Sequence, residues 1–323
     1  MTLLFKGDFL PRSVLQSDTD AGAAVGNLEC AFADDDEDND KAYSVVLPRS
    51  GMENIRSYCF AALSLANNHV NDAGNFRETY AELRRRFPDV QFFGTTEKPF
   101  AEIELLNRRA FVIGCLEPCR SRADFIFKQE DVTALIRKLR SSQPQPPAST
   151  FIFVYPHWGK EGEYTRYPAP WQLRLAREWI DAGADGVFGG HSHVPQGREY
   201  YKGKPIYYSL GNFEFDHPES KLYEGTEDRL RLEVVVEDGI RVKEIFNSEE
   251  AKRRVEQASK VLAGWNMWQW AKRVGPVNLK KNTASWKLRL KKNFIKTLPK
   301  FLVWQLLPDT LLFRIARLCC FKE

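Results

Sequence analysis

The sequence predicts an α/β fold, because short apolar runs rich in strand-forming residues alternate with segments of helical periodicity. Buried strands are predicted, in order, at residues 2–6, 23–28, 60–65, 109–114, 151–155 and 186–188. Helical periodicity covers residues 74–87, 129–140 and 169–182. After residue 189 the pattern changes to strands at 205–210, 230–237 and 240–246, the last two joined by Asp238-Gly239, a typical hairpin turn.

The composition is that of an ordinary soluble globular protein. The chain has 323 residues, of which 43% are hydrophobic and 28% charged, enough for one large domain or two smaller ones. No apolar run reaches the about 18 residues that a membrane-spanning helix needs, and the first residues lack the pattern of a secretory signal. Six cysteines without the spacing of a disulfide framework favour reduced thiols. We therefore expect a cytoplasmic location.

The charge is distributed unevenly along the chain. From residue 280 to residue 323, eleven basic residues stand against two acidic ones, a net charge of +9. Since the whole chain carries +4, the other 279 residues carry −5. This division predicts a mildly acidic globular body with a basic appendage, and it argues against a body that binds nucleic acid.

Two segments have the composition of surface loops. Residues 34–41, DDDEDNDK, form a block of like charge, which is usually solvated, and a metal-binding role is the alternative. Residues 141–150, SSQPQPPAST, have the composition of a linker and mark a candidate domain boundary.

Polar residues that bind metals follow several predicted strands. Taken singly, each has an ordinary structural explanation, such as a capped turn for Asp8 or a buried, hydrogen-bonded imidazole for His157. Taken together they form a pattern, because ligands of α/β sheets gather at the carboxyl ends of strands. Carboxylate, amide and imidazole groups are the mixed ligand set of Mn, Fe or Zn. The residues concerned are Asp8, Glu29, Asn68, His69, His157, His191 and His193.

These positions lie in motifs that resemble a known family. The segments are GDFLPRS, GNLE, LANNHVNDAG, HWGKEGEYTRYPAPWQ, LAREWIDAGADGVFGGHSHVPQ and YSLGNFEFD. Their order is similar to that of the CapA branch of the metallophosphoesterase (calcineurin-like) superfamily, which is associated with capsule and poly-γ-glutamate synthesis. The resemblance implies a four-layer α/β/β/α sandwich over residues 1–247, followed by a helical, basic C-terminal extension over residues 248–323.

The resemblance also implies a centre of two divalent metal ions. One ion would be held by Asp8 and His193. The other would be held by Asn68, His157 and His191, and Glu29 would bridge the two. This sequence departs from the superfamily pattern at the first motif. The usual Asp-x-His reads Asp8-Phe9-Leu10 here, so one imidazole is missing. A second departure is that a glutamate stands where the superfamily has a bridging aspartate.

Further residues receive roles from their place beside the motifs. His69 corresponds to the family's catalytic histidine. Asp72 either orients His69 or caps the helix that begins near residue 74. Arg12, Arg166 and Lys160 are candidate contacts for a phosphate or carboxylate, with a plain surface charge as the alternative for each.

The predicted ligands come from both sides of residues 141–150, so we expect one catalytic domain with a surface crossover. Trp158 and Phe213 are expected to pack beneath the site.

The C-terminal extension has the pattern of an interfacial segment. Residues 248–272 predict a helix, and in residues 286–323 basic residues alternate with Trp, Leu, Phe and Ile. This composition favours binding to an anionic membrane surface, and packing on the domain or on a partner protein is the alternative. Because the globular body is expected to be cytoplasmic, we expect the extension to bind the inner face of the plasma membrane.

Three functions are compatible with these observations. The favoured one is a metal-dependent phosphoester hydrolase of capsule or surface-polymer biosynthesis, acting on a phosphorylated saccharide, a lipid-linked intermediate or a capsule polymer. The second is a component of poly-γ-glutamate synthesis or export that handles the amide-linked polymer. The third is a non-catalytic, membrane-peripheral assembly factor.

Overall fold

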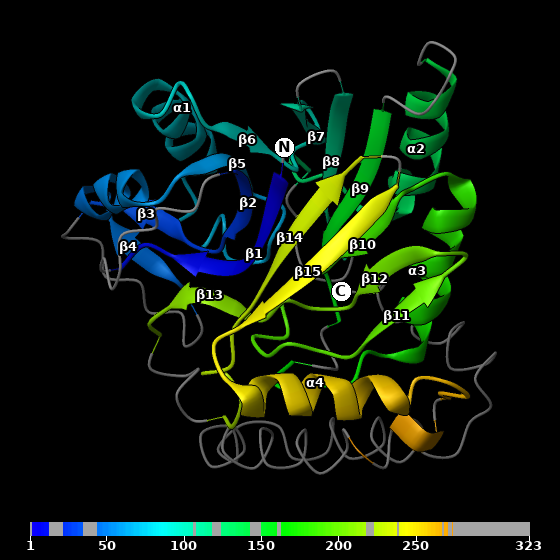
Figure 1. Ribbon diagram of the computed structural model, residues 1–323. Helices are drawn as coiled ribbons and strands as arrows, with labels where there is room; N and C mark the ends of the chain where they lie inside the picture. Colours follow the sequence, from blue (N-terminus) through cyan, green and yellow to red (C-terminus); the bar gives the residue numbers. More distant parts are fainter. Residues whose placement is uncertain are drawn as a thin grey trace, which may run out of the picture.

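The chain folds into two large β-sheets packed face to face between two groups of helices (Figure 1). The structure is a computed structural model that describes residues 2–12, 22–34, 44–105, 108–117, 124–142, 150–159, 163–217, 223–237, 239–266, 268–270 and 273. Residues 35–41, most of the predicted linker, Lys160 and the basic segment 280–323 lie outside this part of the chain.

The first sheet has the strand order β15-β14-β1-β2-β5-β6, with β13 beside β1. Strands β1, β2, β5 and β6 run parallel, whereas β14 and β15 join antiparallel at one side. β1 is covered on both faces and is buried at every position after Thr2, including the charged residues Lys6 and Asp8. The bounds are β1 (Thr2–Leu10), β2 (Ala23–Leu28), β5 (Phe60–Ser64), β6 (Gln91–Phe93), β13 (Asn212–Phe215), β14 (Leu230–Val236) and β15 (Ile240–Phe246).

The second sheet has the order β11-β12-β10-β9-β8-β7. Its central strands β8, β9, β10 and β12 run parallel, and antiparallel strands flank them. The bounds are β7 (Phe100–Leu105), β8 (Arg108–Leu116), β9 (Thr150–His157), β10 (Gly186–Phe188), β11 (Arg198–Tyr201) and β12 (Lys204–Tyr207). Because β8 and β9 pair directly, the segments before and after the predicted linker belong to one sheet.

Three apolar clusters define the four layers. The middle cluster lies between the sheets and includes Phe5 and Phe153. The outer face of the first sheet is covered by η1 (Arg49–Ser57) and α1 (Phe76–Arg86), and that of the second by α2 (Val132–Ser141) and α3 (Pro170–Ala182). In Figure 1 the helices flank the sheets on opposite sides. The predicted α/β/β/α sandwich is confirmed.

Some elements differ from the sequence prediction. Strands β1 and β9 run on through Asp8 and His157, so these two side chains lie within strands and not after them. Short strands were missed, among them β6 and β13, along with the small sheet of β3 (Ala31–Ala33) and β4 (Val46–Pro48). Runs of three or four residues carry too little periodicity to be recognised. The short 3-10 helix η3 (Gln129–Asp131) leads into α2.

The chain after residue 247 begins as part of the same core. Helix α4 (Glu249–Lys260) is shorter than the helix predicted over residues 248–272. Beyond it, Leu262, Trp265 and Trp270 are buried in the cluster that covers the second sheet. Among the described residues, no helix combines the length and apolar character needed to cross a membrane.

The backbone of β1 at Gly7 closely approaches that of Gly211, which directly precedes β13. A Cβ added at Gly7 would lie 1.8 Å from the carbonyl oxygen of Gly211, so any side chain there forces the strands apart. We expect Gly7→Ala to lower the free energy of unfolding by about 2 kcal/mol or more, measured by urea denaturation. The control Gly239→Ala, where a Cβ meets nothing within 4 Å, should be near neutral. Equal stability of the two variants would contradict this account of the strand pairing.

Candidate metal centre

Six predicted ligands from the two sheets meet at one place. Asp8 lies near the end of β1, Glu29 directly follows β2, and Asn68 follows β5 in the first sheet. In the second sheet, His157 ends β9, and the turn after β10 carries the other two histidines. This arrangement follows from the fold, because parallel strands bring their carboxyl ends to one edge of a sheet. The six residues are Asp8, Glu29, Asn68, His157, His191 and His193.

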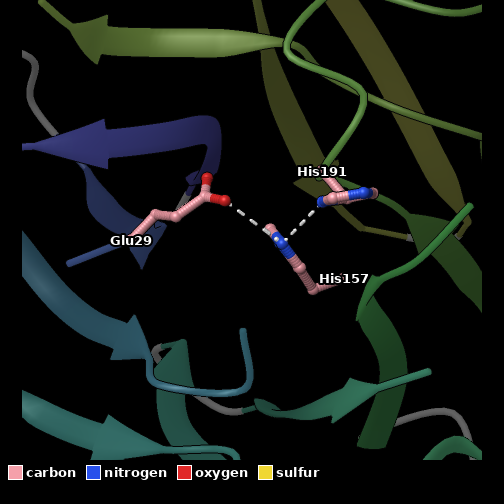
Figure 2. A group of neighbouring side chains, drawn as sticks. All are labelled: Glu29, His157 and His191. Atoms are coloured by element: carbon pink, nitrogen blue, oxygen red, sulfur yellow. Dashed lines mark hydrogen bonds and ion pairs between the residues drawn. The ribbon is translucent and has the colours of Figure 1, made fainter. Parts of the chain in front are cut away.

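One group of ligand atoms is compact. Nε2 of His157 lies 3.3 Å from Oε1 of Glu29 and 3.0 Å from Nδ1 of His191 (Figure 2). Oδ1 of Asn68 lies 2.8 Å from the same Nε2. Ligand atoms about 2.1 Å from a common metal ion lie about 3.0–3.4 Å apart at right-angle to tetrahedral geometry. The spacing of this group therefore suits one ion with four protein ligands.

A second group consists of Asp8, Glu29 and His193, and its ligand atoms lie within 4.8 Å of one another. It is wider, since Nε2 of His193 lies 3.9 Å from Oε1 of Glu29. Leu10, which stands where the superfamily has its extra histidine, is buried in the cluster beneath η1. Glu29 belongs to both groups, as expected for a bridging carboxylate.

Two buried carboxyl groups lie close together here. Asp8 and Glu29 are both fully buried. Burial, and then the charge of Glu29, raise the pKa of Asp8 to about 6, although His157 and His193 act against this. Concentrating negative charge away from water is unfavourable unless a positive partner compensates it. The donor set and its electrostatics together suit a divalent metal ion.

Asparagine side chains that were not predicted as part of the site hold the ligands in place. Nδ2 of Asn27 donates to Oδ1 of Asp8 at 2.9 Å and lies 3.2 Å from Nδ1 of His157. Asn67 donates in turn to Oδ1 of Asn27 at 3.1 Å. Asn27 stands in GNLE and Asn67 in LANNH, so their position inside the quoted motifs was the available signal.

His193 has its own supporting asparagine. Nδ1 of His193 lies 2.9 Å from Oδ1 of Asn212, the first residue of β13. The other ring nitrogen, Nε2, lies 3.9 Å from Oε1 of Glu29, and Nδ1 also lies 3.8 Å from Oδ2 of Asp8. Asn212 lies in the motif YSLGNFEFD, but nothing in the sequence pairs it with a histidine nineteen positions earlier.

The turn that carries the two histidines is strained at the histidines themselves. His191 and His193 have φ angles of 89° and 59°, a region that costs residues other than glycine about 1–3 kcal/mol. The preceding Gly190 has another role, because a Cβ there would lie 2.8 Å from Oδ1 of Asp8. The unusual backbone conformation of this turn is therefore adopted by the two histidines and not by the glycines before them.

His69 and Asp72 form a pair beside the ligands. Nδ1 of His69 lies 2.7 Å from Oδ2 of Asp72, which also accepts a hydrogen bond from the backbone N–H of Val45 at 2.7 Å. Burial lowers the pKa of His69, but the hydrogen bond to Asp72 and the charge of Glu29 outweigh it and raise the pKa. The alternative that Asp72 caps α1 is wrong, because Asn75 occupies that position.

The predicted substrate contacts have different surroundings. Arg12 is exposed just beyond β1, and its charge helps to lower the pKa of His217 to about 4, with burial the larger cause. Arg166 is largely buried, and its Nη2 lies 3.3 Å from Oδ2 of Asp228. Trp158 is buried beside His157 and stacks on Trp179 at 5.2 Å, which confirms its predicted packing role.

Comparison with known proteins identifies related sequences. The chain is 30% identical over 208 residues to the capsule biosynthesis protein CapA of Bacillus anthracis, an alignment covering 59% of this chain and 50% of that protein. It is 28% identical over 190 residues to the PGA biosynthesis protein CapA of Bacillus subtilis, covering 55% and 48%. The chain thus spans about half the length of the curated relatives it matches.

Solved structures show weaker similarity. A phosphatase from Mycoplasma pneumoniae is 12% identical with a TM-score of 0.48, covering 76% of this chain and 92% of that one. With a TM-score below 0.5, this similarity carries no argument about activity.

The sandwich and its buried carboxylate–imidazole groups define an α/β protein with a site suited to divalent metal ions. Residues 10–217 match the model of the family described as bacterial capsule synthesis protein PGA_cap. The chain belongs to this family, and the CapA resemblance of its motifs is confirmed.

The sharing of Glu29 predicts unequal effects of two substitutions. Glu29→Gln should abolish binding of both ions, whereas Asp8→Asn should abolish only the one bound by the wider group. The measurement is metal content by mass spectrometry after incubation with Mn²⁺ and desalting. Glu214→Gln, a half-buried carboxylate outside both groups, is the control and should match the unsubstituted protein. Two ions retained in Glu29→Gln would contradict the assignment.

Proposed function

We propose that this protein is a metal-dependent phosphoester hydrolase that acts in the biosynthesis of a capsule or another surface polymer. The observation that carries the proposal is the pair of ligand groups that share Glu29. Two metal ions joined by one carboxylate are a recurrent arrangement in enzymes that cleave phosphoesters. Membership in a capsule synthesis family supports the polymer context.

In this proposal Mn, Fe or Zn ions are held by two sets of residues. Asp8, Glu29 and His193 hold one ion, and Glu29, Asn68, His157 and His191 hold the other. When bound, such ions polarise the phosphoryl oxygens and lower the pKa of water. The protein supplies the dry, fully buried carboxylates and fixes the imidazoles through Asn27 and Asn212.

His69 is proposed as the group that protonates the leaving oxygen. Its Nδ1 is engaged by Asp72, so Nε2 is the ring nitrogen left to face a substrate. Asp72 is itself fixed by the backbone of Val45, and it therefore holds the imidazole ring in one orientation. A positioned histidine of this kind contributes to catalysis by passing a proton in the transition state.

The proposed substrate is a phosphorylated saccharide, a lipid-linked intermediate or the capsule polymer itself. Arg12 is exposed near the ligand-bearing end of β1 and is a proposed contact for a second anionic group. Arg166 was predicted to serve the same purpose, but its guanidinium group forms an ion pair with Asp228.

A second candidate function is handling of poly-γ-glutamate. The name of the Bacillus subtilis relative, a PGA biosynthesis protein, favours it. In that case the same centre would act on an amide-linked polymer, and phosphoesters would not be turned over. Purified protein offered both a phosphoester panel and poly-γ-glutamate distinguishes the two candidates.

The catalytic proposal predicts separable effects on metal binding and turnover. His69→Ala should lower kcat for phosphoester hydrolysis with Mn²⁺ by about 10²–10⁴-fold, because the proton donor is lost. Its metal content should stay normal, whereas Asp8→Ala should lose the ion of the wider group together with the activity. Lys243→Gln, an exposed residue paired with Glu233, is the control and should keep full activity.

Metal-loaded protein without activity on any phosphoester would contradict phosphoester hydrolysis. Activity on poly-γ-glutamate would then favour the second candidate, and inactivity on both would favour the non-catalytic assembly factor. Unchanged activity in both Asp8→Ala and His69→Ala would contradict the residue assignment.

We also propose that residues 280–323 bind the inner face of the plasma membrane. Reversing Lys291, Lys292 and Lys296 to Glu in the full chain should reduce sedimentation with anionic vesicles more than tenfold, since each basic residue contributes about 1 kcal/mol. Reversing Arg77, Arg84 and Arg85, which are exposed on α1, makes the same charge change elsewhere and serves as control. Equal sedimentation of both variants would contradict the proposal.

A further inference from the structure

The wider ligand group has few ligands, and one of them is unusually well fixed. Its members are Asp8, Glu29 and His193, with Phe9 and Leu10 buried elsewhere. The compact group has four ligands, because Asn68 joins it. An ion in the wider group therefore depends more strongly on how each single ligand is oriented.

The hydrogen bond from His193 to Asn212 determines which ring nitrogen can bind. Nδ1 lies 2.9 Å from the amide oxygen of Asn212, which only accepts hydrogen bonds, so Nδ1 carries the proton. Nε2 then has the free lone pair that a metal ion requires. We propose that Asn212 is a positioning residue, which sets the tautomer and ring plane of His193 and so makes the wider group competent to bind an ion. The proposal rests on the metal centre of the proposed function.

The amide of Asn212 is itself oriented. Its Nδ2 donates to the backbone oxygen of Thr226 at 3.2 Å, which leaves Oδ1 to face the imidazole. The residue is 1% exposed, so water does not compete for either bond. Asn212 also pairs with Asp8 in the register of β13 and β1. Asn212 therefore contacts both the strand that carries Asp8 and the side chain of His193.

Two aromatic rings pack against the imidazole of His193. Tyr164 stacks on the ring of His193 with centroids 5.4 Å apart, and Phe215 lies 4.7 Å away. Tyr164 is held in turn by stacking on Tyr223 at 3.9 Å and by its backbone bond to Ser192. The ring of His193 is therefore confined before any ion arrives.

Ion pairs fasten the loop that carries Thr226. Asp228 interacts with Arg166 at 3.3 Å and with Nη1 of Arg254, on α4, at 3.3 Å. The ion pair with Asp228 gives Arg166 a supporting role in the site, which differs from the predicted contact with substrate. It steadies the loop whose backbone orients Asn212. The described start of the C-terminal extension, through Arg254, takes part in the same support.

The test measures Mn²⁺ binding to the full chain after treatment with a chelator. Binding is measured by calorimetry and by the electron paramagnetic resonance signal of free Mn²⁺. Two binding steps are expected, the weaker one belonging to the wider group. Asn212→Leu should weaken the weaker step by about 10- to 100-fold and leave the tighter step unchanged. Asn212→Asp keeps an acceptor for Nδ1–H and should largely restore the weaker step.

Asn75→Leu is the matched control, because it removes an amide that donates to a backbone oxygen, that of Phe32 at 2.9 Å, outside the site. It should leave both steps unchanged. An unaltered weaker step in Asn212→Leu would overturn the inference, as would equal loss of both steps in the Leu and Asp variants. Protein that binds two ions but hydrolyses no phosphoester would refute the proposed function and leave this inference intact.

Discussion

The structure depends on holding the carboxyl groups of Asp8 and Glu29 together away from water. Both are fully buried, and the pKa of Asp8 is raised to about 6 by burial and by its neighbour. Such an arrangement is unfavourable unless positive charge or strong donors compensate it. The surrounding imidazoles and amides compensate it in part, and a divalent ion would compensate it fully. The buried pair is therefore best understood as a feature of function and not of stability.

The two-sheet fold brings the compensating groups together from distant parts of the chain. The first sheet supplies the carboxylates and the second supplies the imidazoles, so neither sheet alone contains a site. Backbone strain is concentrated at His191 and His193, where positive φ angles aim the two rings at different ligand groups. Rigid neighbours such as Asn212 maintain that geometry.

Much of this arrangement could be predicted from the sequence, because it depends on local patterns. Apolar runs followed by Asp8, Glu29 and His157 identify strand ends, and the parallel strands place those ends at one edge. The partner of His193 could not be predicted in this way. Its bond to Asn212 exists only because the four-residue strand β13 pairs with β1, more than two hundred residues earlier. The strain at the two histidines could not be predicted either, because residues other than glycine rarely adopt positive φ angles.

We propose that Glu29 bridges two metal ions. The most direct test of this proposal is a crystal structure of the protein grown with Mn²⁺, with data collected for anomalous scattering. If Glu29 bridges two ions, we expect two anomalous peaks about 3.5–4 Å apart, one on each side of the Glu29 carboxylate. One peak is expected beside His157 and His191, and the other beside Asp8 and His193. A single peak, or peaks away from Glu29, would contradict the account.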